Sequence, residues 1–369
     1  MMPGHERPTA LLLSGAGARA AYEVGVLGAL AELTASAGNH APFSIMCGLS
    51  AGALNATSLA LAADDFAGGV RRLTSFWRGL HVDDVYRPRW LPCLFGQMRG
   101  GVNGFFDSAP LARRLEQEFD FTRLEHLLAS HALRALCITC LGHASGQSVS
   151  FFQGRPDLEP WRRASRVGAH VALGSRHVLA SMATPLLFPP VKLNREYFHD
   201  GAVPGSSPLS APLHLGAKRI VVIGTGVKAS GEVTRPAQSR PPSLGDMAGR
   251  LLSSVDVVTD DIERMAQVNR LLEYIPAPER SRLPWQPIDC LVLAPSRRPD
   301  LLAVEVMDDL PRSVRSVCAR LGDGEAGASL LASHLAFAPV YTEKLIDLGY
   351  RDAMAESDAI NRFFAPKAD

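Results

Sequence analysis

The chain is 369 residues long, 47% of them hydrophobic and 20% charged, with a formal net charge of +1. This composition excludes a mainly disordered chain, and the small net charge gives no bulk attraction to nucleic acid or acidic lipid. No signal peptide is expected, and no apolar run reaches the roughly 18 residues that a membrane span needs. Six cysteines in a chain of this length indicate reduced thiols, so a cytoplasmic location is expected.

The first part of the chain predicts two strand–turn–helix units. Ala10–Leu13 is an apolar strand, and a helix follows from Ala18 to about Ala35. Phe43–Cys47 predicts the second strand, and Ala53–Ala63 predicts a helix of small residues. Two such units favour a parallel sheet covered by helices on both faces, with functional loops at the carboxyl ends of its strands.

Residues 81–106 lose this regularity, because Pro88, Pro92 and several glycines interrupt it. Large apolar side chains are concentrated there, namely Trp90, Leu91, Leu94, Phe95, Phe105 and Phe106. Two interpretations remain open: a lid or membrane-docking surface, or packing on the core. The later predicted strands and helices are Ala109–Phe119, Ala132–Leu141, Val178–Ala183, Ile220–Ile223, Ile288–Leu293, Leu330–Phe337 and Tyr341–Leu348.

The C-terminal third begins with a polar, proline-containing stretch, Lys228–Pro242, which predicts a flexible loop or linker. A long helix is expected from Ser243, with Asp246 as its capping partner and apolar residues at helical spacing as far as Leu272. The expected division is a core at 8–226, a linker at 227–242, and at 243–369 a long helix, a returning strand and a helical extension packed on the core.

Cys137 and Cys140 have the C-x-x-C spacing of redox and zinc sites. They lie inside the apolar run Leu133–Leu141, in which residues three apart point to opposite faces of a strand. Ordinary core cysteines are therefore the favoured interpretation. No cluster of histidine, cysteine and carboxylate residues has convincing metal spacing, so neither a metal nor a cofactor is expected.

Two motifs near the N-terminus contain groups that could take part in catalysis. Leu11–Leu13 leads into Ser14-Gly15-Ala16-Gly17-Ala18-Arg19-Ala20, a turn whose backbone N–H groups can face an anion at a helix N-terminus. Cys47-Gly48-Leu49-Ser50-Ala51-Gly52 contains Gly-x-Ser-x-Gly, the strand-to-helix turn that exposes a serine hydroxyl. A nucleophilic serine and backbone donors for an oxyanion are the two halves of an acyl-transfer site. The motifs predict a serine hydrolase.

Two other interpretations of these motifs are less favoured. The Gly-x-Ser-x-Gly pattern also occurs in a tight turn with a capping serine. Gly15-x-Gly17-x-x-Ala20 fits a dinucleotide fingerprint, but that needs an acidic residue at the end of the next strand. The sequence has Cys47-Gly48-Leu49-Ser50 there.

The two motifs do not say which residue deprotonates Ser50. Ser50 follows only two predicted strands, too early for the order of serine, acid and histidine in ordinary α/β-hydrolases. Asp200, in Tyr197-Phe198-His199-Asp200-Gly201-Ala202, is the other candidate, although Asp-Gly on its own is commonly just a turn. His199 is a less favoured third member, because neighbours in an extended segment point to opposite faces.

Four motifs, in order, resemble the patatin-like phospholipase family. They are the loop Gly15 to Ala20, the turn Gly48–Gly52, Ala180-Ser181-Met182-Ala183-Thr184-Pro185, and Asp200-Gly201-Ala202. The similarity is best over residues 8–226. It implies a three-layer α/β/α sandwich with a mainly parallel central sheet and a helical C-terminal extension. It also implies hydrolysis of acyl esters of lipids through an acyl-enzyme, without a metal.

The resemblance assigns Ser50 as nucleophile and Asp200 as base. Oxyanion donors are expected at Gly15, Ala16, Gly17 and Ala18, with Ala51 a further candidate, and support from Arg19, Gly48, Gly52 and Gly201. Arg19 fits a substrate contact and a structural ion pair equally well. Expected partners are phospholipid or other fatty-acyl esters and, transiently, a membrane surface, but no nucleic acid. The alternative function is a non-catalytic lipid-binding or regulatory protein with the same fold.

The chain departs from the family pattern at two places. Ala16 and Ala20 stand where the family more often has glycine. A backbone donor survives such a change where φ is negative, so Ala16 fits unless the loop needs a positive φ. The segment Val203–Pro208 lacks the asparagines that are common there, which affects substrate detail more than the dyad.

Overall fold

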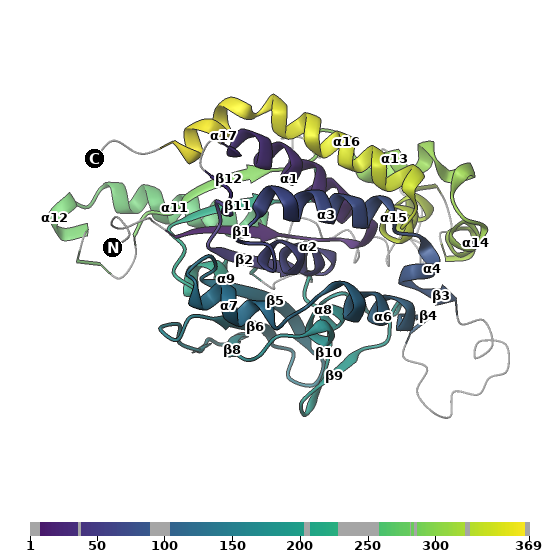
Figure 1. The fold of residues 1–369 in the computed structure, drawn as a ribbon, viewed down its shortest axis with the longest axis horizontal. Helices are drawn as coiled ribbons and strands as arrows, with labels where there is room; N and C mark the ends of the chain where they lie inside the picture. The colour runs from purple at the N-terminus through teal and green to yellow at the C-terminus, as the bar shows by residue number, and fades with distance from the viewer. Residues whose placement is uncertain are drawn as a thin grey trace, which may run out of the picture.

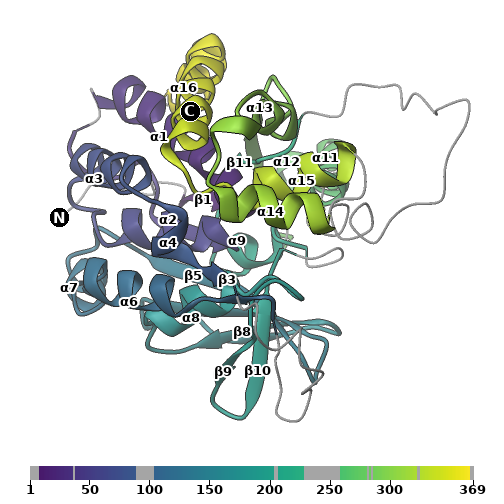
Figure 2. The ribbon, with the colours of Figure 1, turned by 90° about the vertical axis from the view of Figure 1, so that its right-hand side faces the viewer.

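The computed structural model describes residues 8–35, 38–88, 104–202, 207–227, 258–280, 282–283, 286–321 and 325–365. Within these residues, a ten-stranded mixed sheet runs through the molecule with helices on both of its faces (Figures 1 and 2). The α/β/α sandwich with a mainly parallel sheet and a helical C-terminal region is therefore confirmed.

Five strands form the parallel part of the sheet. The central strand, β1 (Thr9–Leu13), lies between β2 (Ile45–Leu49) and β11 (Arg219–Ile223) and runs parallel to both. β12 (Asp289–Leu293) extends the sheet beyond β11, and β5 (Ala135–Gly142) extends it beyond β2. Because all five run in the same direction, their carboxyl ends and the loops that follow them meet at one edge of the sheet.

Further strands, which the sequence patterns do not predict, continue the sheet past β5. β10 (Glu196–Asp200) is antiparallel to the end of β5, with Asp200 opposite Cys140. The others are β6 (Ser148–Gly154), β7 (Trp161–Arg162), β8 (Arg166–His170) and β9 (Val191–Leu193), and β3 (Arg87–Pro88) pairs separately with β4 (Phe106–Asp107). The antiparallel pairing of β10 carries Asp200 to the edge where β2 ends.

Alternation along the strands separates two hydrophobic cores. In β1, Leu11 and Leu13 point into the larger core, whereas Ala10 and Leu12 point into the smaller one. A strand buried on both faces reads as an unbroken apolar run, as Ala10–Leu13 does. Cys137 and Cys140 likewise lie in different cores, which confirms them as core residues on opposite faces of β5.

Helices α1 (Ala21–Leu33), α2 (Ala51–Ala60) and α3 (Phe66–Arg78) cover the larger core, and α9 (Ser210–His214) and α11 (Thr259–Glu273) cover the smaller one (Figure 2). The remaining helices and 3₁₀ turns are η1 (Gly17–Ala20), α4 (Val82–Val85), α6 (Ala109–Glu118), α7 (Arg123–Ala129), α8 (Ser175–Ser181), α12 (Ala277–Arg280), α13 (Pro299–Glu305), η4 (Met307–Asp309), α14 (Arg312–Leu321), α15 (Glu325–Leu335), α16 (Pro339–Ala355) and α17 (Ser357–Phe364). None of the described helices is both long and apolar enough to cross a membrane.

The C-terminal helices pack on the core in two places. α16 lies along α1, and α15 lies at the carboxyl ends of the parallel strands (Figure 1). The end of the apolar stripe predicted from Ser243 is helical as α11, in which Ile262 and Met265 pack against the smaller core. The beginning of that stripe and the predicted linker at 227–242 lie almost entirely outside the described residues.

The irregular region 81–106 is described only at its ends. Phe106 is buried, with its ring centroid 4.5 Å from that of Tyr86, so this residue belongs to the core. Phe105 is 43% exposed. Trp90, Leu91, Leu94 and Phe95 lie outside the described residues.

Candidate active site

Ser50 occupies the turn between β2 and α2. Its backbone has φ of 51° and ψ of −135°, a sparsely populated conformation that costs on the order of 1–3 kcal/mol and persists only where its surroundings enforce it. The N–H of Ser50 donates to Ser181 Oγ at 2.9 Å, and Ser181 in turn donates to the carbonyl of Thr139 at 2.7 Å. The end of α8 therefore fixes this turn against β5.

Asp200 accepts a hydrogen bond from Ser50. Oδ2 lies 2.7 Å from Ser50 Oγ and 3.0 Å from Thr184 Oγ1, while Oδ1 accepts the N–H of Ala202 at 2.9 Å. Burial of the carboxyl raises the pKa of Asp200 to about 6, and the hydrogen bonds from Ala202, Ser50 and Thr184 oppose that shift. The group is ionised at neutral pH but is a stronger base than an exposed aspartate.

The imidazole of His199 points away from this pair. Its Nε2 lies 3.1 Å from Nδ1 of His143. Consecutive residues of β10 thus face opposite ways, as the extended segment predicts. Of the two, the structure brings Asp200 to Ser50 and leaves His199 on the other side of the strand.

The glycine-rich loop after β1 has three successive residues with positive φ. Gly15 has φ of 76°, Ala16 of 92° and Gly17 of 61°. The loop therefore does need a positive φ at Ala16, where alanine fits poorly, since a left-handed alanine is strained by roughly 1–2 kcal/mol. Ala20 has φ of −63° and carries no such strain.

The donors of this loop do not all point the same way. The N–H of Gly15 donates to Oε1 of the Glu23 carboxyl group at 2.7 Å. Gly17 and Ala18 begin the 3₁₀ turn η1, where the first N–H groups have no partner within the turn. The N–H groups of Ala16, Gly17 and Ala18 therefore remain the candidate donors for an oxyanion. Backbone atoms of neighbouring segments pack closely against the other motif glycines, Gly48, Gly52 and Gly201.

The side chain of Arg19 binds the C-terminal region. Its Nε and Nη2 donate to Ser333 Oγ at 2.9 and 2.6 Å, and Nη2 also donates to the carbonyl of Leu330 at 3.4 Å. The guanidinium is buried, and that burial lowers its pKa. Arg19 is thus a structural anchor between η1 and α15 whose partners are a hydroxyl and a carbonyl.

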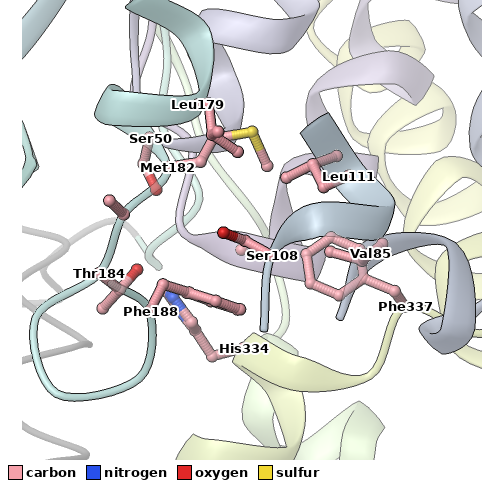
Figure 3. A pocket seen from close by; sticks show the side chains of 12 residues that line it. Ser50, Val85, Ser108, Leu111, Leu179, Met182, Thr184, Phe188, His334 and Phe337 are labelled. Carbon is pink, nitrogen blue, oxygen red and sulfur yellow. The ribbon is translucent and has the colours of Figure 1, made fainter. Parts of the chain in front are cut away.

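A narrow cavity of about 20 Å³ opens beside Ser50 (Figure 3). That volume is close to what a single water needs. The labelled walls come from three parts of the chain: Val85, Ser108 and Leu111; Leu179, Met182, Thr184 and Phe188; and His334 and Phe337. Most of these side chains are apolar.

The patatin-like phospholipase family model matches residues 11–213, more than half of the chain. The chain belongs to that family. Its members are lipid acyl hydrolases, and the matched range contains both motif turns and Asp200. No curated protein matches the chain. The crystal structure of VipD from Legionella pneumophila aligns with 96% of this chain and 67% of that chain, with a TM-score of 0.37 and 12% identity.

Sequence reasoning missed the group behind the glycine loop of this patatin-like chain. Glu23 is fully buried, and its second oxygen accepts from Asn55 Nδ2 at 2.8 Å. Trp77 Nε1 donates to Asn55 Oδ1 at 2.7 Å and so fixes which way the amide points. Burial raises the pKa of Glu23 to about 8, against the hydrogen bonds from Gly15 and Asn55. The sequence does single out Glu23, because it is a lone acid in the apolar run between Ala20 and Leu30.

Ser181 and Thr184 are a second omission. Both belong to the motif Ala180–Pro185, which entered the sequence argument only as part of the family pattern. In the fold they hold the backbone of Ser50 and the carboxylate of Asp200. Among the residues that the structure describes, no group of three or more histidine, cysteine and acidic side chains is placed to hold a metal ion.

Proposed function

We propose that this protein hydrolyses a carboxylic ester of a phospholipid or another fatty-acyl lipid with Ser50 and Asp200 as a catalytic dyad. The observation that carries the proposal is the 2.7 Å hydrogen bond from Ser50 Oγ to Asp200 Oδ2, made inside a mostly apolar cavity. Ser50, Asp200 and the N-termini of η1 and α2 lie at the carboxyl ends of β1 and β2, which supports the proposal.

Ser50 Oγ attacks the acyl carbon while its proton passes to Asp200. The carbonyl oxygen becomes an oxyanion, and the N–H groups of Ala16, Gly17 and Ala18, with Ala51 at the start of α2, stabilise it. The intermediate collapses to an acyl-enzyme, and the departing alkoxide takes the proton from Asp200. Water then gives a proton to Asp200 and attacks the acyl group. The bond between the acyl carbon and Ser50 Oγ breaks, Asp200 returns the proton to Oγ, and the fatty acid leaves.

Contact with a lipid surface is part of the proposal. Phe105 and Leu186 are 43% and 64% exposed, and the N–H of Phe105 donates to the carbonyl of Leu186 at 3.0 Å. The backbones of these two exposed residues are therefore adjacent, and Phe188, whose ring centroid lies 5.7 Å from that of Phe106, lines the cavity. We expect the double variant Phe105→Ser, Leu186→Ser to lose activity on vesicles while it keeps activity on a soluble short-chain ester. Equal losses on both substrates would contradict the surface role.

The function is tested with a mixed lipid extract and a fluorophosphonate probe. Wild type is expected to release fatty acids, identified by mass spectrometry, and to carry the probe on Ser50. Ser50→Ala should do neither, whereas Ser130→Ala, which changes an exposed serine at the end of α7, should behave as wild type. A wild type that binds lipid but neither hydrolyses it nor reacts with the probe would favour the non-catalytic alternative.

A further inference from the structure

His334, near the end of α15, lines the same cavity as Ser50 although it lies more than 280 residues away in the chain. It is only 4% exposed, and its Nδ1 is buried with no hydrogen-bond partner among the described residues. Figure 3 shows the imidazole reaching from its helix into the space that Thr184 and Ser50 also line. A buried polar atom without a partner lowers stability, so its position calls for an explanation.

The surrounding contacts fix His334 in this position. Oγ of its neighbour Ser333 accepts two hydrogen bonds from the guanidinium of Arg19, and Tyr86 Oη donates to the carbonyl of Leu335 at 2.9 Å. The residue also packs directly on the glycine loop. A Cβ at Gly17 would collide with the carbonyl oxygen of His334 and lie 2.8 Å from its Cδ2. The Cδ2 edge of the imidazole therefore lies against the backbone of the glycine loop at Gly17.

The charge state of the ring limits what it can do. Burial and the positive charge of Arg19 lower the pKa of His334 to about 3. The imidazole is therefore neutral at pH 7, with one N–H donor and one lone pair. An ester offers acceptor oxygens and no donor, so the ring can hydrogen-bond to it only by donating. A neutral ring with this low a pKa does not carry the serine proton, which stays with Asp200.

We propose that His334 is a side-chain donor to the carbonyl oxygen of the substrate, beside the N–H groups of the glycine loop. The inference rests on the proposed function, because it needs an ester positioned at Ser50. The imidazole keeps its proton throughout and strengthens its hydrogen bond as negative charge grows on that oxygen. It lies beyond the residues 11–213 that the family model matches, so the C-terminal region completes the site.

The experiment compares two substitutions at this position, with p-nitrophenyl butyrate as the substrate. In His334→Asn, the amide nitrogen takes the place of Nδ1 and can still donate, whereas His334→Leu fills the space without a donor. We expect His334→Leu to lower kcat about 100-fold with a much smaller change in KM, as for loss of one oxyanion donor. His334→Asn should stay within about tenfold of wild type. His126→Leu, on the exposed face of α7, is the matched control.

The outcomes separate this inference from the proposed function. Equal kcat for wild type, His334→Asn and His334→Leu would overturn it, and so would equal losses in both variants together with lowered melting temperatures. In either case, fluorophosphonate labelling of Ser50 in wild type would leave the proposed function standing. A wild type that does not label at Ser50 would overturn the proposed function and the inference with it.

Discussion

The two turns of the site are strained in different ways. In the turn after β2, only Ser50 has a positive φ, and side chains from distant segments hold it: Ser181 on its N–H and Asp200 on its hydroxyl. The turn after β1 has three successive positive φ values, and the buried carboxyl group of Glu23 accepts a hydrogen bond from Gly15 in it.

The two turns therefore differ in whether the side chain that supports the turn would also take part in the reaction. At Ser50, one of the two side chains that hold the turn, Asp200, is also the proposed base, so its loss should abolish turnover and leave the fold intact. Around Gly15, the groups that would act are backbone N–H groups, and the side chain that holds them never meets substrate. A change there should affect stability and activity together.

The largest effect is expected from Asp200→Asn. The amide keeps the shape and can still pair with Ser50, Thr184 and Ala202, but it cannot accept the serine proton. Ester hydrolysis should fall by at least about 1,000-fold, because one group serves as both base and acid. Melting curves at pH 8 should show no loss of stability. His199→Ala is the control, and an equally inactive, well-folded His199→Ala would replace the dyad with a histidine-dependent mechanism.

The pH dependence follows from the same carboxyl. Because the pKa of Asp200 is raised to about 6, the reactive ionised form is lost below that pH. We expect kcat/KM to fall about tenfold for each pH unit below 6. The stability term has the opposite sign: a raised pKa favours the folded state below about pH 4, and that contribution, roughly 2–3 kcal/mol, is lost as pH rises through 6.

A direct measurement checks both signs. Wild type should lose stability between pH 4 and 7 relative to Asp200→Asn, which has no group to titrate at that position. The activity profile of wild type on a soluble ester should rise over the same range. A profile with its midpoint near 4 would show that Asp200 behaves as an exposed aspartate or is not the base.

Much of this site was predictable because its motifs are local. The apolar runs before Gly15 and Ser50 identify β1 and β2, and parallel strands bring the loops after them together. The place of Asp200 depends on β10 pairing antiparallel with β5 across about 60 residues, and short strands of mixed polarity carry little periodic signal. Glu23 could be singled out as a lone acid in an apolar run, but its partners Gly15 and Asn55 could not. The contacts of Ser181 and the proposed role of His334 also depend on tertiary contacts that no local pattern contains.

The glycine turn is tested by Glu23→Gln at pH 9, above the raised pKa of Glu23, where its carboxyl group is ionised. Both carboxylate oxygens accept from donors, Gly15 N–H and Asn55 Nδ2, and Trp77 prevents the Asn55 amide from flipping. A glutamine must therefore place its NH₂ against one of these donors. We expect stability to fall by about 1–3 kcal/mol, the cost of an unsatisfied buried group.

Activity should fall with it, by about tenfold, because the loop loses its support. The measurement pairs melting temperature with the rate of fluorophosphonate labelling of Ser50. Glu32→Gln makes the same chemical change on the exposed side of α1 and should alter neither. Loss of labelling without loss of stability would mean that Glu23 acts on the reaction itself. The side chains that support the two turns would then not differ in role.

The smallest effect is expected at the two alanines of the loop, and its sign is the test. Ala16 has φ of 92°, so Ala16→Gly removes a strain of about 1–2 kcal/mol, which the greater freedom of glycine in the unfolded chain partly offsets. Ala20 has φ of −63° at the start of α1, where glycine costs up to about 1 kcal/mol relative to alanine. Chemical denaturation of the two variants should therefore show Ala16→Gly equal to or more stable than wild type and Ala20→Gly less stable. Labelling of Ser50 should persist in both, because each keeps its backbone N–H. If Ala16→Gly were the less stable of the two, the left-handed conformation at Ala16 would not destabilise the folded protein.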